Sequence, residues 1–161
     1  MATSEGMNRR EWVRSMIVAG IAATTIAASR DTFLLPADTA ITVYKDPNCG
    51  CCKKWVSHLE ANGFKVTTHD RSDMNALKDS FSVPSALRSC HTAVVGKLVV
   101  EGHVPAADVR TALARAPKGT IGLAVPGMPA GSPGMETGRV DRYDVIAFDA
   151  RGNSSVFATH R

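Results

Sequence analysis

The feature that most constrains this chain is a run of three cysteines within four positions, in the stretch DPNCGCCKKW (46–55). The chain has four cysteines among its 161 residues, and the fourth is Cys90. Neighbouring side chains of one backbone segment point in different directions, so Cys49, Cys51 and Cys52 cannot all pack as small apolar groups. The cluster therefore indicates redox chemistry, metal binding or both.

The hydrophobic pattern around the cluster predicts an α/β fold. The segments expected, in chain order, are a strand at 41–44, a helix at 51–62, a strand at 64–69, a short helix at 74–81, a β-hairpin at 92–101 and a helix that begins at Pro105. A strand–helix–strand opening requires a right-handed crossover and a parallel strand pair. The expected core is therefore β-α-β-α-β-β-α, with the cysteines between its first strand and first helix.

The C-terminal part of the chain has a different character. Glycine and proline are dense over 119–138, which predicts a loop with little regular structure. Two further strands are expected at 143–148 and 155–159, joined by a turn around Gly152. This hairpin is expected as an addition to the sheet.

The N-terminus predicts export. A basic segment holds Arg9-Arg10, and an uncharged apolar run follows over 15–29. That run is shorter than the roughly 20 residues of a membrane-spanning helix, and small residues end it, as in a secretory signal. The paired arginines resemble the twin-arginine signal. We therefore expect an export signal at 1–29, a linker at 30–40, a single domain at 41–161, a periplasmic location and no stable membrane span in the mature form.

The net charge of +4 comes without a run of arginine or lysine, so the sequence offers no nucleic-acid-binding signal. Cys49 and Cys52 form a C-x-x-C pair at the junction of a strand and a helix. This spacing brings two sulfurs within reach of a disulfide, and the free N–H groups of a helix start stabilise a thiolate. The pair therefore serves either a thiol–disulfide oxidoreductase, with Cys49 and Cys52 as catalytic residues, or a metal site.

Cys51 favours the metal site, because a third thiol between two redox cysteines would compete in disulfide exchange. Soft thiolates select Cu(I), zinc or iron–sulfur clusters. Zinc needs four ligands, which Cys49, Cys51, Cys52 and Cys90 are able to supply, although the adjacent Cys51 and Cys52 do not easily reach one ion. Several bridged Cu(I) ions suit such crowded thiolates better, and a structural zinc site stays the weaker alternative.

Four segments resemble the CopG-like copper-resistance family of exported bacterial proteins, which was long known as a domain of unknown function. They are NCGCCKKW (48–55), SCHTAVV (89–95), EGHVP (101–105) and GLAVPGMPAGSPGMET (122–137). The resemblance implies a thioredoxin-like fold, periplasmic copper binding through Cys49, Cys51, Cys52 and Cys90, and a redox role in handling Cu(I) and Cu(II). Other exported copper-handling proteins are the partners it suggests.

Four further side chains are weaker candidates for copper ligands. His91 follows Cys90 and either ligates the metal, hydrogen-bonds a cysteine sulfur or faces solvent. His103 either binds metal or fixes the helix start at Pro105. Met128 and Met135 lie in the glycine- and proline-rich loop, and their thioether sulfurs either bind Cu(I) or fill gaps beneath the loop. The sequence thus predicts an exported copper-tolerance protein that sequesters, converts or hands over Cu(I), with an oxidoreductase as the alternative.

Overall fold

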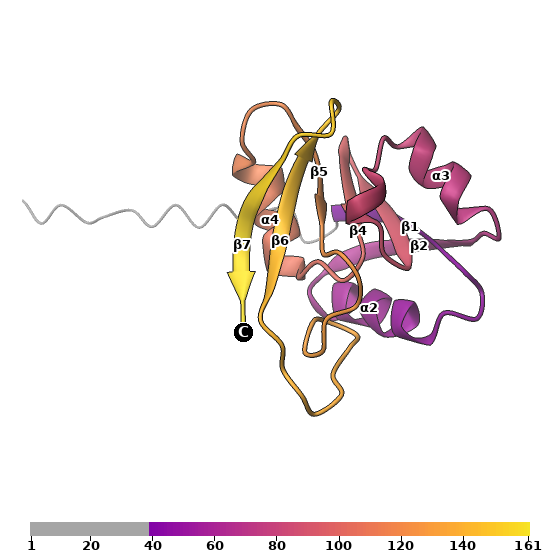
Figure 1. Ribbon diagram of the computed structural model, residues 1–161. Helices are drawn as coiled ribbons and strands as arrows, with labels where there is room; N and C mark the ends of the chain where they lie inside the picture. The colour runs from indigo at the N-terminus through magenta and orange to yellow at the C-terminus, as the bar shows by residue number, and fades with distance from the viewer. Residues whose placement is uncertain (1–38) are drawn as a thin grey trace, which may run out of the picture. The chain divides into compact units, whose positions relative to one another are not determined.

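The structure is a computed structural model that describes residues 39–161 (Figure 1). The predicted export signal and the linker up to residue 38 lie outside the described residues. The elements are β1 (Thr39–Lys45), α2 (Gly50–Ala61), β2 (Phe64–Asp70), α3 (Met74–Ser80), the 3₁₀ turn η1 (Ser85–Leu87), β3 (His91–Val95), β4 (Leu98–Glu101), α4 (Ala106–Arg115), β5 (Thr120–Ala124), β6 (Tyr143–Asp149) and β7 (Ser154–His160).

One mixed sheet organises the described residues, with the strand order β2-β1-β3-β4-β5-β6-β7. β1 pairs with β2 in parallel, as the strand–helix–strand opening predicted, and β4 pairs with β5 in parallel. The other neighbouring strands are antiparallel. The mixed α/β class and the order of the first α-helices and strands are confirmed.

Helices contribute to the core on both faces of the sheet. Trp55 of α2 and Val109 of α4 pack with Val100 of β4 in the larger apolar cluster. Val99, the neighbour of Val100, instead packs with Val83 beyond α3 in a second cluster. Because successive strand residues point to opposite faces, α2 and α4 cover one face and the α3–η1 segment covers the other.

The structure adds one strand that the sequence analysis missed. Residues 120–124 lie inside the segment expected to be irregular, yet they form β5, which joins β4 to the C-terminal hairpin. The hairpin was predicted correctly, and β5 makes it a continuous part of the sheet. Gly122 leaves room on β5 for the Phe148 ring, which occupies the space where a side chain would lie. The short, glycine-interrupted run hid this strand from pattern analysis.

The strand register brings distant segments together beside the cysteines. β1 and β3 are antiparallel with Lys45 opposite His91, so the start of β3 lies beside the end of β1. A turn leads from β1 into α2, where the Asn48 N–H donates to Asp46 Oδ1 at 2.7 Å. β4 ends at Glu101, and the Gly102 N–H donates to the His91 carbonyl at 3.0 Å. The residues that follow β1, precede β3 and follow β4 therefore meet.

Candidate metal centre

The four cysteine sulfurs converge at this meeting point. Their Sγ atoms all lie within 4.8 Å of one another. Cys49 and Cys52 form a disulfide, whereas Cys51 and Cys90 are free thiols. Cys51 Sγ is 3.6 Å from Cys49 Sγ and 3.8 Å from Cys90 Sγ, so it lies between the C-x-x-C pair and the distant cysteine. Cys90 therefore joins the cluster although it is far away in sequence.

The start of α2 holds three of these sulfurs in place. Cys49 is the N-cap of the helix, and its Sγ accepts a hydrogen bond from the Cys52 N–H at 3.3 Å. Cys52 is fully buried, while Cys49 and Cys51 are partly exposed. The unpaired N–H groups and the dipole of a helix start favour negative charge, so this position stabilises a thiolate when the cysteines are reduced.

His103 directs its Nε2 atom toward Cys90 Sγ, at a distance of 3.2 Å. Its other ring nitrogen, Nδ1, is 2.7 Å from the Pro133 carbonyl. Because a carbonyl only accepts, Nδ1 carries the proton and Nε2 of the neutral ring presents its lone pair to the sulfur. A metal-binding histidine is typically oriented by such a bond from its second nitrogen. The buried His103 therefore has the arrangement of a nitrogen ligand.

His91 also approaches Cys90, with Nδ1 at 3.2 Å from Sγ. The ring is fully buried, and its centroid is 4.3 Å from that of Trp55 and 5.0 Å from that of His103. Its Nε2 atom is buried without a hydrogen-bond partner among the described residues. The solvent-facing alternative for His91 is therefore wrong, and Cys90, His91 and His103 form a second compact donor group.

Burial keeps these donors uncharged in the absence of metal. Burial, followed by the proximity of Cys51, raises the pKa of the Cys90 thiol to about 12. Burial lowers the pKa of His91 well below its usual value, and His103 and Lys78 lower it further. Burial also lowers the pKa of His103, against the opposing effect of the Pro133 carbonyl. Neutral imidazoles are the form that binds metal, whereas a cysteine must release its proton, so metal binding here is coupled to proton release.

The glycine- and proline-rich loop covers the site. Pro133 supplies the carbonyl that orients His103, and the Gly134 N–H donates to Glu136 Oε1 at 2.8 Å. Met135 is partly buried and lines a surface hollow of about 290 Å³ together with Cys51. Met128 is 53 % exposed. Of the two methionine candidates, the structure thus places Met135 beside a cysteine.

The arrangement brings together soft sulfur donors and two imidazole nitrogens. Thiolate and thioether sulfurs suit Cu(I), and imidazole suits copper and zinc. Four sulfurs within 4.8 Å of one another allow one thiolate to bridge two ions. The site therefore has the chemistry of a thiolate-rich metal centre. The assignments of Cys49, Cys51, Cys52 and Cys90 as ligands, and of His91, His103, Met128 and Met135 as weaker ligands, stay predictions.

The sequence analysis missed a buried polar network next to the site. Lys78 and Glu101 form an ion pair with 2.5 Å between Nζ and Oε1, and both side chains are buried. Glu101 also accepts a hydrogen bond from the Ser89 N–H at 2.6 Å, immediately before Cys90. A lysine in the middle of a short surface helix carries no local signal that it will be buried.

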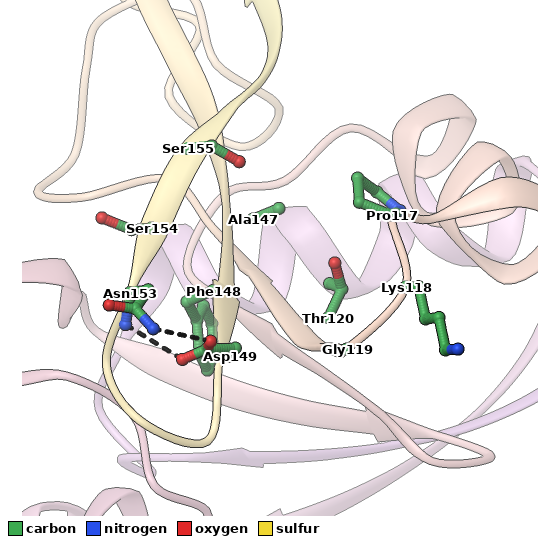
Figure 2. Close-up of a pocket in the computed structure, with 10 residues that line it drawn as sticks. All are labelled: Pro117, Lys118, Gly119, Thr120, Ala147, Phe148, Asp149, Asn153, Ser154 and Ser155. Atoms are coloured by element: carbon green, nitrogen blue, oxygen red, sulfur yellow. Dashed lines mark hydrogen bonds between the residues drawn. The ribbon is translucent and has the colours of Figure 1, made fainter.

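A second hollow, of about 190 Å³, lies where the start of β5 meets the turn of the β6–β7 hairpin (Figure 2). Asp149 there accepts hydrogen bonds from the N–H and the side-chain amide of Asn153, and from the Arg151 N–H. The lining of this hollow contains no cysteine, histidine or methionine, so the hollow offers no soft ligand.

No helix within residues 39–161 is long and apolar enough to cross a membrane.

Comparison with known proteins finds a family model and solved structures that are similar to this chain. The family described as "Protein of unknown function, DUF411" matches residues 87–135. Two solved structures, "Copper resistance protein copG- Form 2" and "Copper resistance protein copG- Form 1", are each 53% identical to this chain. The match to Form 2 spans 76% of this chain and 98% of the solved chain, with a TM-score of 0.72. The match to Form 1 spans 75% of this chain and 96% of the solved chain, with a TM-score of 0.71. No protein with a curated description matches.

These structural matches agree with the cysteine cluster and with the mixed α/β sheet described above. Both matches extend over nearly the whole length of the solved chains. The chain belongs to the CopG-like copper-resistance family, as its cysteine, histidine and loop motifs predicted.

Proposed function

We propose that this protein is an exported, periplasmic copper-tolerance protein that holds Cu(I) as a multinuclear cluster on Cys49, Cys51, Cys52 and Cys90. The observation that carries the proposal is the convergence of all four Sγ atoms within 4.8 Å of one another. Crowded thiolates bridge several soft ions readily, whereas zinc prefers a closed tetrahedron around one ion. His91 Nδ1 and His103 Nε2, each 3.2 Å from Cys90 Sγ, are additional donors beside this set, and Met135 lines the same hollow as Cys51.

The disulfide gives the site a means of exchanging electrons with copper. When Cys49 and Cys52 form their disulfide, two thiols lose two protons and two electrons, and two Cu(II) ions become two Cu(I) ions by accepting those electrons. Forming the disulfide also removes two thiolate ligands, so oxidation weakens copper binding. Sequestration, redox conversion and handover to other exported copper-handling proteins are thus different uses of one thiol cluster.

An anaerobic Cu(I) titration of the reduced protein, starting at residue 30, against a competing chelator tests the proposal. We expect more than one Cu(I) per chain, with the thiols protected from alkylation. Cys51→Ser and Cys90→Ser should each lower both the stoichiometry and the affinity. Unchanged binding in both variants would refute the four-cysteine site, and tight stoichiometric zinc with no preference for Cu(I) would favour a structural zinc site.

The methionines provide a matched pair of variants. Met135→Leu removes a thioether that lines the hollow beside Cys51, whereas Met128→Leu removes one that is 53 % exposed. We expect a lower Cu(I) affinity in the first variant and wild-type affinity in the second. A wild-type affinity of Met135→Leu would remove Met135 from the set of ligands.

The Cys49–Cys52 disulfide at the start of α2 supports a second candidate function, a thiol–disulfide oxidoreductase. That function predicts turnover of a small disulfide substrate without copper, abolished by Cys49→Ser and retained in Cys51→Ser. The copper function predicts little turnover of this kind in any variant.

A further inference from the structure

A buried ion pair lies directly behind the Cys90 side of the site. Lys78 of α3 is 3 % exposed and Glu101 of β4 is 0 % exposed, and the Lys78 ammonium also donates to Thr92 Oγ1 at 2.9 Å. Removing two charges from water is costly, and a buried ion pair is often no more stabilising than apolar side chains of the same size. Its place next to Cys90 therefore suggests a role other than stability alone.

Glu101 accepts hydrogen bonds from the residues on both sides of the Cys90–His91 pair. Its Oε1 atom accepts from the Ser89 N–H at 2.6 Å, and its Oε2 atom accepts from the Thr92 hydroxyl at 2.6 Å. β3 begins only at His91, so Ser89 and Cys90 precede the regular strand pairing. The Glu101 carboxylate thus accepts the hydrogen bond of the Ser89 N–H, in place of a carbonyl from a neighbouring strand.

Glu101 also lies directly before the segment that carries His103. Glu101 is the last residue of β4, and His103 follows two residues later with Nε2 at 3.2 Å from Cys90 Sγ. The Lys78 ammonium holds one carboxylate oxygen, and the Thr92 hydroxyl holds the other. A carboxylate fixed in this way sets the separation between the segment that carries Cys90 and the segment that carries His103.

We propose that Glu101 is a positioning residue whose hydrogen bond to the Ser89 N–H holds Cys90 at the distance needed for copper binding, while Lys78 balances the buried charge of the carboxylate. The inference rests on the proposed function, because it concerns the same thiol cluster. Glu101 acts through the Ser89 backbone, and neither Glu101 nor Lys78 is among the proposed metal ligands. Outer partners that orient metal ligands typically contribute about 10- to 100-fold to metal affinity, and we expect an effect of this size.

Two double variants separate positioning from charge. Lys78→Met with Glu101→Gln removes both charges but keeps an amide oxygen able to accept from the Ser89 N–H. Lys78→Met with Glu101→Leu removes both charges and that acceptor. Both variants leave no buried charge unpaired, so they differ mainly in the tether to Ser89. We expect the Gln variant to bind Cu(I) within about threefold of wild type and the Leu variant to bind at least about tenfold more weakly.

The third comparison adds Cys90→Ser to each double variant. If the tether acts through Cys90, the Gln and Leu versions should bind Cu(I) equally once Cys90 is absent, because their effects are not additive. A tenfold difference that persists without Cys90 would overturn the proposal and show a general structural effect. Equal affinities of the Gln and Leu variants with Cys90 present would overturn it as well.

A copper-free readout keeps this test separate from the proposed function. Alkylation of Cys90, measured by peptide mass mapping against Cys51 as the internal reference, should be faster in the Leu variant and unchanged in the Gln variant. Absence of Cu(I) binding by the wild type would refute the proposed function, whereas equal Cys90 alkylation in the two variants would refute the tether. If the Leu variant does not fold, Thr92→Val removes one of the contacts to Glu101 and should raise Cys90 alkylation in the same direction, and no change would count against the proposal.

Discussion

A substitution at Gly134 tests whether the glycine- and proline-rich loop orients His103. Its backbone has a φ of 87°, and a Cβ atom added there would lie 2.8 Å from the Cys51 carbonyl oxygen and 2.9 Å from the Trp55 nitrogen. Both neighbours are backbone atoms of α2, which cannot turn aside as a flexible side chain would. Gly134→Ala therefore forces the loop away from the helix that carries the cysteines.

Gly138→Ala is the matched control. Gly138 has a similar φ of 83°, and an added Cβ would meet no atom within 4 Å. Placing alanine in the left-handed region costs about 1–2 kcal/mol, and both variants incur this cost. Overpacking adds about 1–3 kcal/mol at Gly134 alone, so we expect Gly134→Ala to lower the free energy of unfolding by that further amount.

The displacement should also reach the candidate metal centre. A retreat of roughly 0.6 Å restores an ordinary contact distance and lengthens the 2.7 Å bond from His103 Nδ1 to the Pro133 carbonyl to about 3.3 Å, at the long end of the hydrogen-bond range. With that bond weakened, His103 is held less firmly in its orientation, and Cu(I) affinity should fall by about tenfold. Gly138→Ala should bind as wild type does.

Urea unfolding, Cu(I) competition and ¹⁵N NMR of the histidine ring together test this prediction. The NMR spectrum of wild type should show a His103 ring protonated at Nδ1, and Gly134→Ala should lose this preference. If the two alanine variants had equal stabilities and equal Cu(I) affinities, the inferred contact between the loop and α2 would be refuted.

Three other predictions concern buried groups. Trp55→Phe removes the indole N–H that donates to the Val104 carbonyl at 2.9 Å. The free energy of unfolding, measured in urea, should fall by about 1–3 kcal/mol, because the carbonyl stays buried without its partner. An unchanged urea midpoint would contradict this prediction. Lys78→Met leaves the Glu101 charge buried and unpaired, so unfolding should show a loss of about 3–5 kcal/mol, and replacing both residues by apolar side chains should recover part of it. The pKa of Cys90 is about 12 in the folded chain against 9.0 for a free cysteine, so the unfolded chain loses this proton first as the pH rises. The free energy of unfolding should therefore fall between pH 9 and pH 12, more steeply than in Cys90→Ser, and parallel curves for the two proteins would refute the assignment.

The sequence predicted most elements of the fold because their patterns are local. The alternation at 41–44 and the helical spacing of Trp55 and Leu59 depend only on neighbouring residues, and both segments form the expected elements. β5 escaped prediction because its partners, β4 and β6, are distant in the sequence and its own residues include Gly122. Its strand character depends on the two ladders that flank it.

The candidate site was predictable to a similar extent. The sequence alone showed that Cys49 and Cys52 lie at a strand–helix junction with disulfide spacing, and the structure pairs them. It left open whether His91 faces solvent, because a residue at the start of a strand can turn to either face. No local pattern encodes the contact between α2 and α4 in which His58 Nε2 accepts a hydrogen bond from the Ala106 N–H at 3.1 Å.

The sequence by itself therefore determined the donor atoms: three cysteines at one helix start, a fourth beside a histidine, and methionines in a glycine- and proline-rich loop. Only the tertiary structure decided which of these donors share a site, through the β1–β3 register that places His91 opposite Lys45. It also decided their protonation, because burial raises the pKa of Cys90 and lowers that of His103. Ligand type is a property of single residues, whereas distance and desolvation arise from contacts between segments far apart in the chain.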